Sequence, residues 1–215
     1  MTKFFYSMAK SQNPLTGKMS GAMGNFVTSS LGSHNIVRAK AFNPRDAKTE
    51  AQQKQRGGFK MMGELFPLFG GILIEGFSER SANSQVYSAF MAANLPNAVD
   101  KSGESAAIDF SKVKVSDGSL PIPVIQSAIL TENGITISIN TQLKNQLNSS
   151  TDELVALVLL KSGELWIERQ LRGENLTQSI LIPVEGIVAE EIQGTYLFAK
   201  RANSNKVSKS VFVGI

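Results

Sequence analysis

The sequence ENGITISIN (residues 132–140) combines an Asn-Gly turn signal with a strictly alternating apolar run. Ile135, Ile137 and Ile139 alternate with Thr136 and Ser138, which is the period-two pattern of a strand that buries one face. Because runs of this kind, separated by turn signals, recur over the last hundred residues, we expect a β-rich domain there.

The strands expected around this run are short and evenly spaced. The candidates are DFSKVKV (109–115), IQSAILT (125–131), GITISIN (134–140), ELVALVLL (153–160), ELWIERQL (164–171), TQSILIPV (177–184), GTYLFAKRA (194–202) and KSVFVGI (209–215). Their spacing predicts an immunoglobulin-like, fibronectin type III-like β-sandwich over residues 99–215, with Trp166 on an early-middle strand and Tyr196 on a late one. There is no cysteine for an antibody-type disulfide.

Residues 48–98 carry helix signals, so the chain as a whole is predicted to be α+β. Thr49 is a good N-cap and Gln52 follows three residues later, which predicts a capping box. Gly57-Gly58 is expected to weaken or break this helix, and Pro67 to end it. A second helix is expected over 84–95, capped by Ser84, with its Phe and Met side chains in core packing or in contacts between subunits.

Residues 1–47 form a glycine-rich arm. The runs GNFVTSSL (24–31) and NIVRAKAF (35–42) predict a β-hairpin that turns at Gly32-Ser33 or at His34-Asn35. The large apolar side chains of the arm are too few for their burial to offset the entropy lost on ordering it. We therefore expect the arm to be ordered only against the rest of the chain, a neighbouring subunit or a ligand surface.

Charge is distributed unevenly along the chain. Residues 1–60 hold ten Lys/Arg and two acids, whereas residues 61–215 hold 12 bases and 16 acids. This asymmetry predicts an acidic partner for the front end, which is nucleic acid, an acidic protein surface or a copy of the same protein. The alternative is that the bases only keep a flexible segment soluble.

The sequence offers little for catalysis. It has no cysteine and one histidine, His34, in an expected hairpin turn. The carboxylate pairs Asp152-Glu153 and Glu190-Glu191 are interpreted as solvated loop charges, and GKMSGAMG (17–24) matches a nucleotide-binding fingerprint only weakly. We expect no enzyme activity, cofactor, metal or small-molecule substrate, and no membrane span, because no apolar run approaches about 20 residues. The N-terminus is too polar for a secretory signal.

The opening of the chain resembles a group of uncharacterised proteins common in Bacteroidota and their phages. The resemblance covers about the first 60 residues and rests on NPLTGKMSGAMGNFV, NIVRAKAF and NPRDAKTEAQQKQRGGFK. The last run holds a helix-start motif made of Pro44, Thr49, Gln52 or Gln53, Arg56 and Phe59. The resemblance implies a C-terminal β-sandwich and an association with phages, and it implies no catalytic residues.

These observations predict a structural virion protein, a capsid- or tail-associated subunit of a phage-like particle, present in the host cytoplasm during assembly. The residues expected to contact neighbouring subunits are Gly17, Gly21, Gly24, Phe26, Arg38, Lys40, Phe42, Arg45, Lys48 and Arg56. Its basic residues would meet an acidic neighbour or packaged DNA, and the glycines would allow close backbone approach. The alternatives are a nucleic-acid-binding protein without sequence preference, which acts through residues 1–60, and an adhesion module, which needs an export route.

Overall fold

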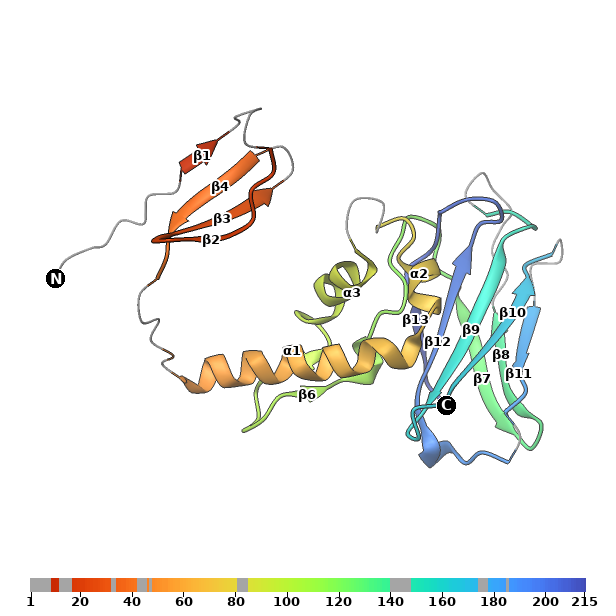
Figure 1. Cartoon of the computed structure of the whole chain (residues 1–215). Coiled ribbons are helices and arrows are strands. Elements are labelled where there is room, and N and C mark those ends of the chain that lie inside the picture. The colour runs from red at the N-terminus through yellow and green to blue at the C-terminus, as the bar shows by residue number, and fades with distance from the viewer. Residues whose placement is uncertain are drawn as a thin grey trace. The chain divides into compact units, whose positions relative to one another are not determined.

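The computed structural model divides the chain into two compact units, unit 1 (Met1–Lys48) and unit 2 (Thr49–Ile215) (Figure 1). It describes residues 9–11, 17–31, 34–41, 46, 48–80, 85–139, 148–173, 178–184 and 186–215. Helices and several antiparallel sheets coexist, as expected for an α+β protein. None of the helices in this described part is long and apolar enough to cross a membrane.

Unit 1 contains one antiparallel sheet with the strand order β1-β4-β3-β2. Its strands are β1 (Ala9–Ser11), β2 (Gly21–Met23), β3 (Phe26–Leu31) and β4 (His34–Ala39). The predicted hairpin is confirmed, because β3 and β4 pair from Phe26↔Ala39 to Leu31↔His34. The two residues between them are Gly32-Ser33, which lie outside the described residues, while His34-Asn35 belongs to β4.

The described part of unit 2 begins with three helices. They are α1 (Glu50–Phe69), α2 (Ile72–Gly76) and α3 (Val86–Asn94). The capping box is confirmed: the Gln52 amide donates to the Thr49 hydroxyl at 3.3 Å, and the Thr49 amide donates to Gln52 Oε1 at 3.3 Å. The expected cap Ser84 lies outside the described residues, and Gln85 occupies the N-cap position of α3 without a side-chain hydrogen bond.

Gly57-Gly58 does not break α1 and Pro67 does not end it, so the predicted break and the predicted end are both wrong. The helix continues through both glycines and through Pro67 to Phe69. Gly58 is buried, and a Cβ on it would lie 2.9 Å from Val99 Cγ1. The glycine therefore lets α1 approach the segment around Val99 closely, and this packing outweighs the low helix propensity of glycine.

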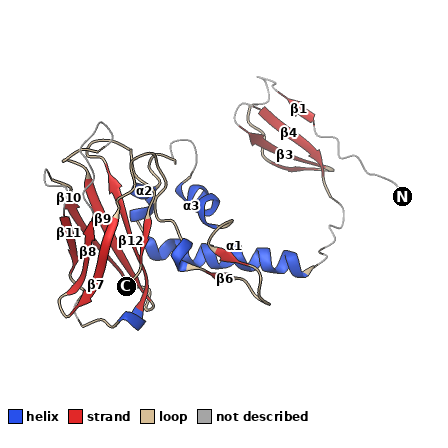
Figure 2. Ribbon diagram, turned by 180° about the vertical axis from the view of Figure 1, so that it is seen from behind, coloured by secondary structure: helices blue, strands red, loops and turns tan. Residues whose placement is uncertain are grey.

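Two antiparallel sheets form the rest of unit 2, with the orders β10-β9-β12-β13 and β11-β8-β7. Their strands are β7 (Ile125–Thr131), β8 (Gly134–Ile139), β9 (Glu153–Leu160), β10 (Leu165–Leu171), β11 (Gln178–Ile182), β12 (Ile192–Lys200) and β13 (Val211–Val213). A short pair, β5 (Val99–Asp100) and β6 (Ala107–Ile108), lies between α3 and these sheets along the chain. Figures 1 and 2 show the three helices beside the first sheet and the second sheet on its other side.

The strand expected over 109–115 is absent, which is a second correction. Residues Phe110–Lys112 form a short 3₁₀ helix, η2, capped by Asp109, whose carboxylate accepts from the Ser111 amide at 3.1 Å. Asp favours such a cap because its side chain bonds to the backbone two residues on. A second 3₁₀ helix, η3 (Ala189–Glu191), precedes β12.

Strand β9 explains how the layers hold together. Seven consecutive residues, Leu154–Leu160, are buried, as its unbroken apolar run requires of a strand covered on both faces. Alternate residues, including Ala156 and Val158, pack between the two sheets, while those between them, Val155, Leu157 and Leu159, pack beneath the helices. On the helical side, the buried Tyr196 of β12 donates its hydroxyl to the Phe110 carbonyl at 2.9 Å and fixes η2.

Candidate functional site

The sheet of unit 1 carries most of the predicted contact residues. Its β2–β3 turn is Gly24-Asn25, with Gly24 at φ 56, a left-handed conformation that favours glycine at the first central position of a hairpin turn. The Lys40 amide donates to the Asn25 carbonyl at 2.7 Å and extends the pairing of β3 and β4 beyond Ala39. The turn and the end of β4 therefore lie at one end of the sheet, which we call the turn end.

A polar clamp, rather than an apolar core, fixes the other end of this sheet. Asn35 is 5 % exposed, and its Oδ1 accepts from the Met19 amide at 3.0 Å and from the Ser30 hydroxyl at 3.1 Å. Its Nδ2 donates to the Gly17 carbonyl at 2.6 Å. Asparagine supplies both a donor and an acceptor, so one side chain holds residues 17–19 against β3 and β4.

The described apolar side chains of unit 1 lie outside any buried core. Among its described side chains only Thr28 and Asn35 are buried, and both are polar. Directly paired residues of antiparallel strands share a face, so Met23, Phe26 and Ala39 form a row at the turn end. Met23 is 61 % exposed and Phe26 is 53 % exposed. The shortage of apolar burial predicted for this segment is thus present in the described part of the sheet.

The predicted basic residues are partly brought together. Arg38 and Lys40 are exposed at the turn end, on the face opposite Phe26, and neither side chain has a partner among the described residues. Lys48 is exposed, with φ 45. Arg56 lies exposed on α1 in unit 2. Phe42 and Arg45 lie outside the described residues.

The three predicted glycines differ in what surrounds them. Gly17, Gly21 and Gly24 all have positive φ, and no atom lies within 4 Å of a Cβ placed on any of them. Their conformation therefore requires glycine, but no close approach to other parts of the described chain does.

The described residues contain no group of side chains arranged like a catalytic centre. His34 lies in β4, half-buried, and not in the turn where one alternative placed it. The described residues hold no group of three or more His, Cys, Asp or Glu that fits a metal ion. One hollow of about 460 Å³, with a mainly polar lining, lies beside Asp100, Asp109 and Lys112.

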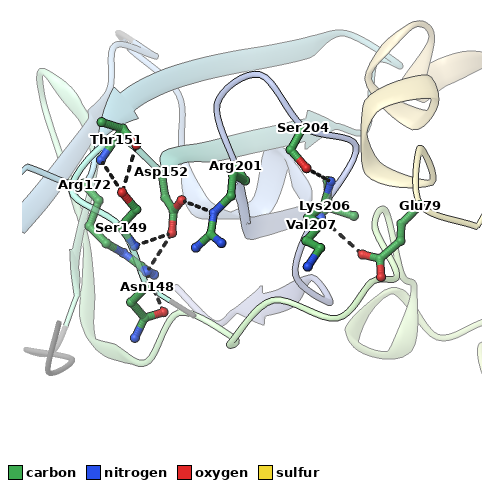
Figure 3. Close-up of polar contacts among 10 residues, drawn as sticks. All are labelled: Glu79, Asn148, Ser149, Thr151, Asp152, Arg172, Arg201, Ser204, Lys206 and Val207. Atoms are coloured by element: carbon green, nitrogen blue, oxygen red, sulfur yellow. Dashed lines mark hydrogen bonds and ion pairs between the residues drawn. The ribbon is translucent and has the colours of Figure 1, made fainter. Parts of the chain in front are cut away.

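The interpretation of Asp152 as a solvated charge is wrong. Figure 3 shows Arg172 and Arg201 approaching its carboxylate from two sides. Asp152 is 1 % exposed, accepts from the Ser149 amide at 2.8 Å and from Arg201 Nε at 3.1 Å, and lies 3.6 Å from Arg172 Nη1. Burial lowers the pKa of Arg172, while the charge of Asp152 opposes that shift. The signal in the sequence was an acid at the start of β9 with arginines at the ends of two other strands.

Arg172 and Glu79 secure the loops around this cluster. Arg172 Nη1 donates to Asn148 Oδ1 at 2.9 Å. Glu79 Oε2 accepts from the Ser119 amide at 3.0 Å. It also accepts from the Val207 amide at 3.4 Å (Figure 3). These hydrogen bonds tie the loops to one another and to the helical layer, so the role of these side chains is structural.

A group of exposed acids lies where β9 turns into β10. The Lys161 amide donates to the Glu191 carbonyl at 2.8 Å, which places η3 beside this turn. Glu164, Glu190 and Glu191 are exposed there, with Glu168 two residues beyond Trp166 on β10. The interpretation of Glu190-Glu191 as solvated charges is confirmed by their exposure. We call this surface, with the exposed Trp166 and Val188, the acidic end of unit 2.

Comparison with known families gives one match, over residues 18–214, to a family of unknown function, DUF6266. The chain belongs to the DUF6266 family. The match spans both units. Curated proteins give no match to the chain, and neither do solved structures.

Proposed function

We propose that this protein is a structural, non-catalytic subunit of a larger assembly and that the sheet of unit 1 contacts the neighbouring subunit. The observation that supports this most directly is the lack of buried apolar side chains in the described part of that sheet, beside exposed Met23 and Phe26. Apolar burial is the main favourable term in folding, and a partner that covers this face supplies what the unit does not supply itself.

The assembly proposed is a phage-like virion, in which the chain is capsid- or tail-associated. The resemblance of the first 60 residues to proteins of Bacteroidota and their phages supports this choice. Arg38 and Lys40, whose side chains have no partner among the described residues, suit an acidic neighbour, because charges of opposite sign across an interface steer association and fix its register.

Unit 2 is proposed to be a fibronectin type III-like sandwich that carries a helical layer. Of its seven sandwich strands, the first, second and fifth form one sheet and the third, fourth, sixth and seventh form the other. Immunoglobulin-type sandwiches likewise split strands A, B and E from C, F and G. Trp166 departs from the immunoglobulin pattern, because it is 37 % exposed on β10 and does not fill the core.

Zero-length cross-linking of intact particles tests the assembly role. A carbodiimide joins lysines to carboxylates in contact, so Lys18 and Lys40 should form links to a different protein chain, identified by mass spectrometry. Lys209, exposed in unit 2, is the matched control. If the native protein sediments as a free single chain and is missing from purified particles, the proposal fails.

Nucleic-acid binding is the second candidate, favoured by one observation. Arg38 and Lys40 are exposed and unpaired in the described structure, and residues 1–48 hold seven Lys/Arg against one acid. Backbone binding requires such bases and no sequence-reading motif. It predicts a DNA affinity that falls steeply with salt and is lost in an Arg38→Glu/Lys40→Glu variant; no retention of DNA at low salt eliminates this candidate.

A further inference from the structure

Two surfaces of this chain complement each other in charge and in composition. The turn end of unit 1 presents Met23 and Phe26 on one face and Arg38 and Lys40 on the other. The acidic end of unit 2 presents Glu164, Glu190 and Glu191, and the same elements carry Trp166, Val188, which is 52 % exposed, and the half-buried Glu168. Each combines exposed apolar groups with charges mostly of one sign.

Most charges on the two surfaces make no ion pair or side-chain hydrogen bond within the described part of the chain; Glu191 accepts from the Val188 amide at 3.4 Å. The ion pairs there involve other groups, among them Arg169 with Glu75 and Arg80 with Asp117. Neither Arg38 and Lys40 nor Glu164, Glu168 and Glu190 takes part in any of them. Lys161 is the single base among these carboxylates in residues 161–168 and 188–191. Other acids differ: Asp109, for example, already pairs with Lys112 at 2.7 Å.

We propose that the turn end of unit 1 binds the acidic end of unit 2 of a second copy, so that chains associate head to tail. The inference rests on the assembly role proposed above and names the partner for it. Two turn ends meeting each other would bring Arg38 and Lys40 against their own copies, and like charges at an interface are unfavourable. A head-to-tail contact avoids this, uses different surfaces on the two partners, and generates rings or open filaments.

Complementary variants test the direction of the contact. The head variant is Arg38→Glu/Lys40→Glu, and the tail variant is Glu164→Lys/Glu190→Lys, both in the full chain. In sedimentation velocity, the wild-type protein should form species larger than a dimer as its concentration rises. Each variant alone should remain a single chain. The control variants Lys209→Glu and Glu104→Lys, exposed sites outside both surfaces, should associate as the wild type does.

An equimolar mixture of the two variants gives the decisive result. One intact head and one intact tail remain, so the mixture should restore association, beginning with a dimer of two different chains, although neither variant associates alone. Association of the wild type should fall at least tenfold between about 50 and about 500 mM NaCl, because the Debye length shrinks over that range. Phe26→Ser and Trp166→Ser, which keep all charges, should weaken association from opposite sides of the contact.

Three results would overturn the inference. One is a wild-type chain that stays single at every concentration. Another is a mixture of variants that stays single, since this places the contact within one chain or between like ends. The third is association that only the head variant loses, which indicates a different partner surface. A single wild-type chain that is still cross-linked through Lys40 to another protein in particles refutes self-association and leaves the assembly role intact.

Discussion

Glu75 and Arg169 form a two-point ion pair across 94 residues of sequence, with Oε1–Nη2 at 2.8 Å and Oε2–Nη1 at 3.0 Å. Glu75 belongs to α2 and Arg169 to β10, so the pair ties the helical layer to the first sheet of the sandwich. Lys200 Nζ, 2.7 Å from Glu75 Oε2, adds a second cation from β12. Bidentate, partly buried pairs of this kind contribute more than ordinary surface pairs.

Glu75→Gln should lower the free energy of unfolding by about 1–2 kcal/mol at pH 7, a value reduced for partial solvent screening. Chiefly because of its bond to Arg169, the pKa of Glu75 falls from 4.5 to about 2. A lowered pKa stabilises the fold above the unfolded value and loses that effect as pH falls. The difference between wild type and variant in urea unfolding should therefore shrink between about pH 5 and about pH 2.

Glu64→Gln is the matched control, because Glu64 is exposed and lies 3.9 Å from Lys60. It should change stability by less than about 0.5 kcal/mol. A Glu75→Gln difference that stays constant from pH 7 to pH 2 would show that the carboxylate charge has no part in the effect.

Gly76→Ala should be among the most damaging single-methyl additions in unit 2. A Cβ at Gly76 would lie 2.1 Å from the Val115 carbonyl oxygen, and this backbone is buried between α2 and the first sheet. The overlap should cost about 2–4 kcal/mol in chemical denaturation. At Gly71 nothing lies within 4 Å of the added carbon and φ is −64°, so Gly71→Ala should be neutral or slightly stabilising. Equal effects of the two variants would contradict this account.

Asp152→Asn should destabilise unit 2 by about 2–4 kcal/mol, because removing the acid leaves the charge of Arg172, which is 5 % exposed, poorly compensated. Its neighbour Glu153 makes a more exposed pair with Arg169 at 3.1 Å, and Glu153→Gln should cost only about 0.5 kcal/mol. Denaturant titrations followed by circular dichroism compare the two; a smaller loss for Asp152→Asn than for Glu153→Gln would be inconsistent with a buried clamp.

Phe26→Ser should leave folding almost unchanged, because the side chain is 53 % exposed on the sheet of unit 1. We expect a change below about 0.5 kcal/mol, as for exposed sites in general. The NMR resonances of unit 1 report its folding, and the fluorescence of Trp166, the single tryptophan, reports that of unit 2. Collapse of the unit 1 spectrum in this variant would mean that Phe26 serves the fold and not an interface.

The features predicted correctly from sequence are those set by local pattern. The continuous run 153–160 became a doubly covered strand, the alternation over 134–139 became a strand with one buried face, and Thr49 with Gln52 made the capping box. In each case neighbours along the chain carry the information, through side-chain period or through a bond three residues long.

The errors came from contacts distant in sequence. Gly58 is accommodated in α1 by its approach to Val99, and Asp152 is buried because arginines 20 and 49 residues later meet it. Within 109–115, Phe110–Lys112 form η2, whose Phe110 carbonyl is held by Tyr196, 86 residues away; the Asp109 cap is the one local contribution. At the candidate site, the sequence indicated the basic and glycine-rich character of unit 1 but could not show which side chains meet at the turn end, because the strand register determines that.

Strand β9 has a consequence for how unit 2 can be divided. Its side chains belong to two separate hydrophobic cores. Val155, Leu157 and Leu159 are buried by the helices, and Ala156 and Val158 are buried by the opposite sheet. A sandwich trimmed of residues 49–120 would present three bare aliphatic side chains on its central strand and be prone to aggregation. The helical layer and the sandwich should therefore fold as one unit and cannot be separated into two stable domains.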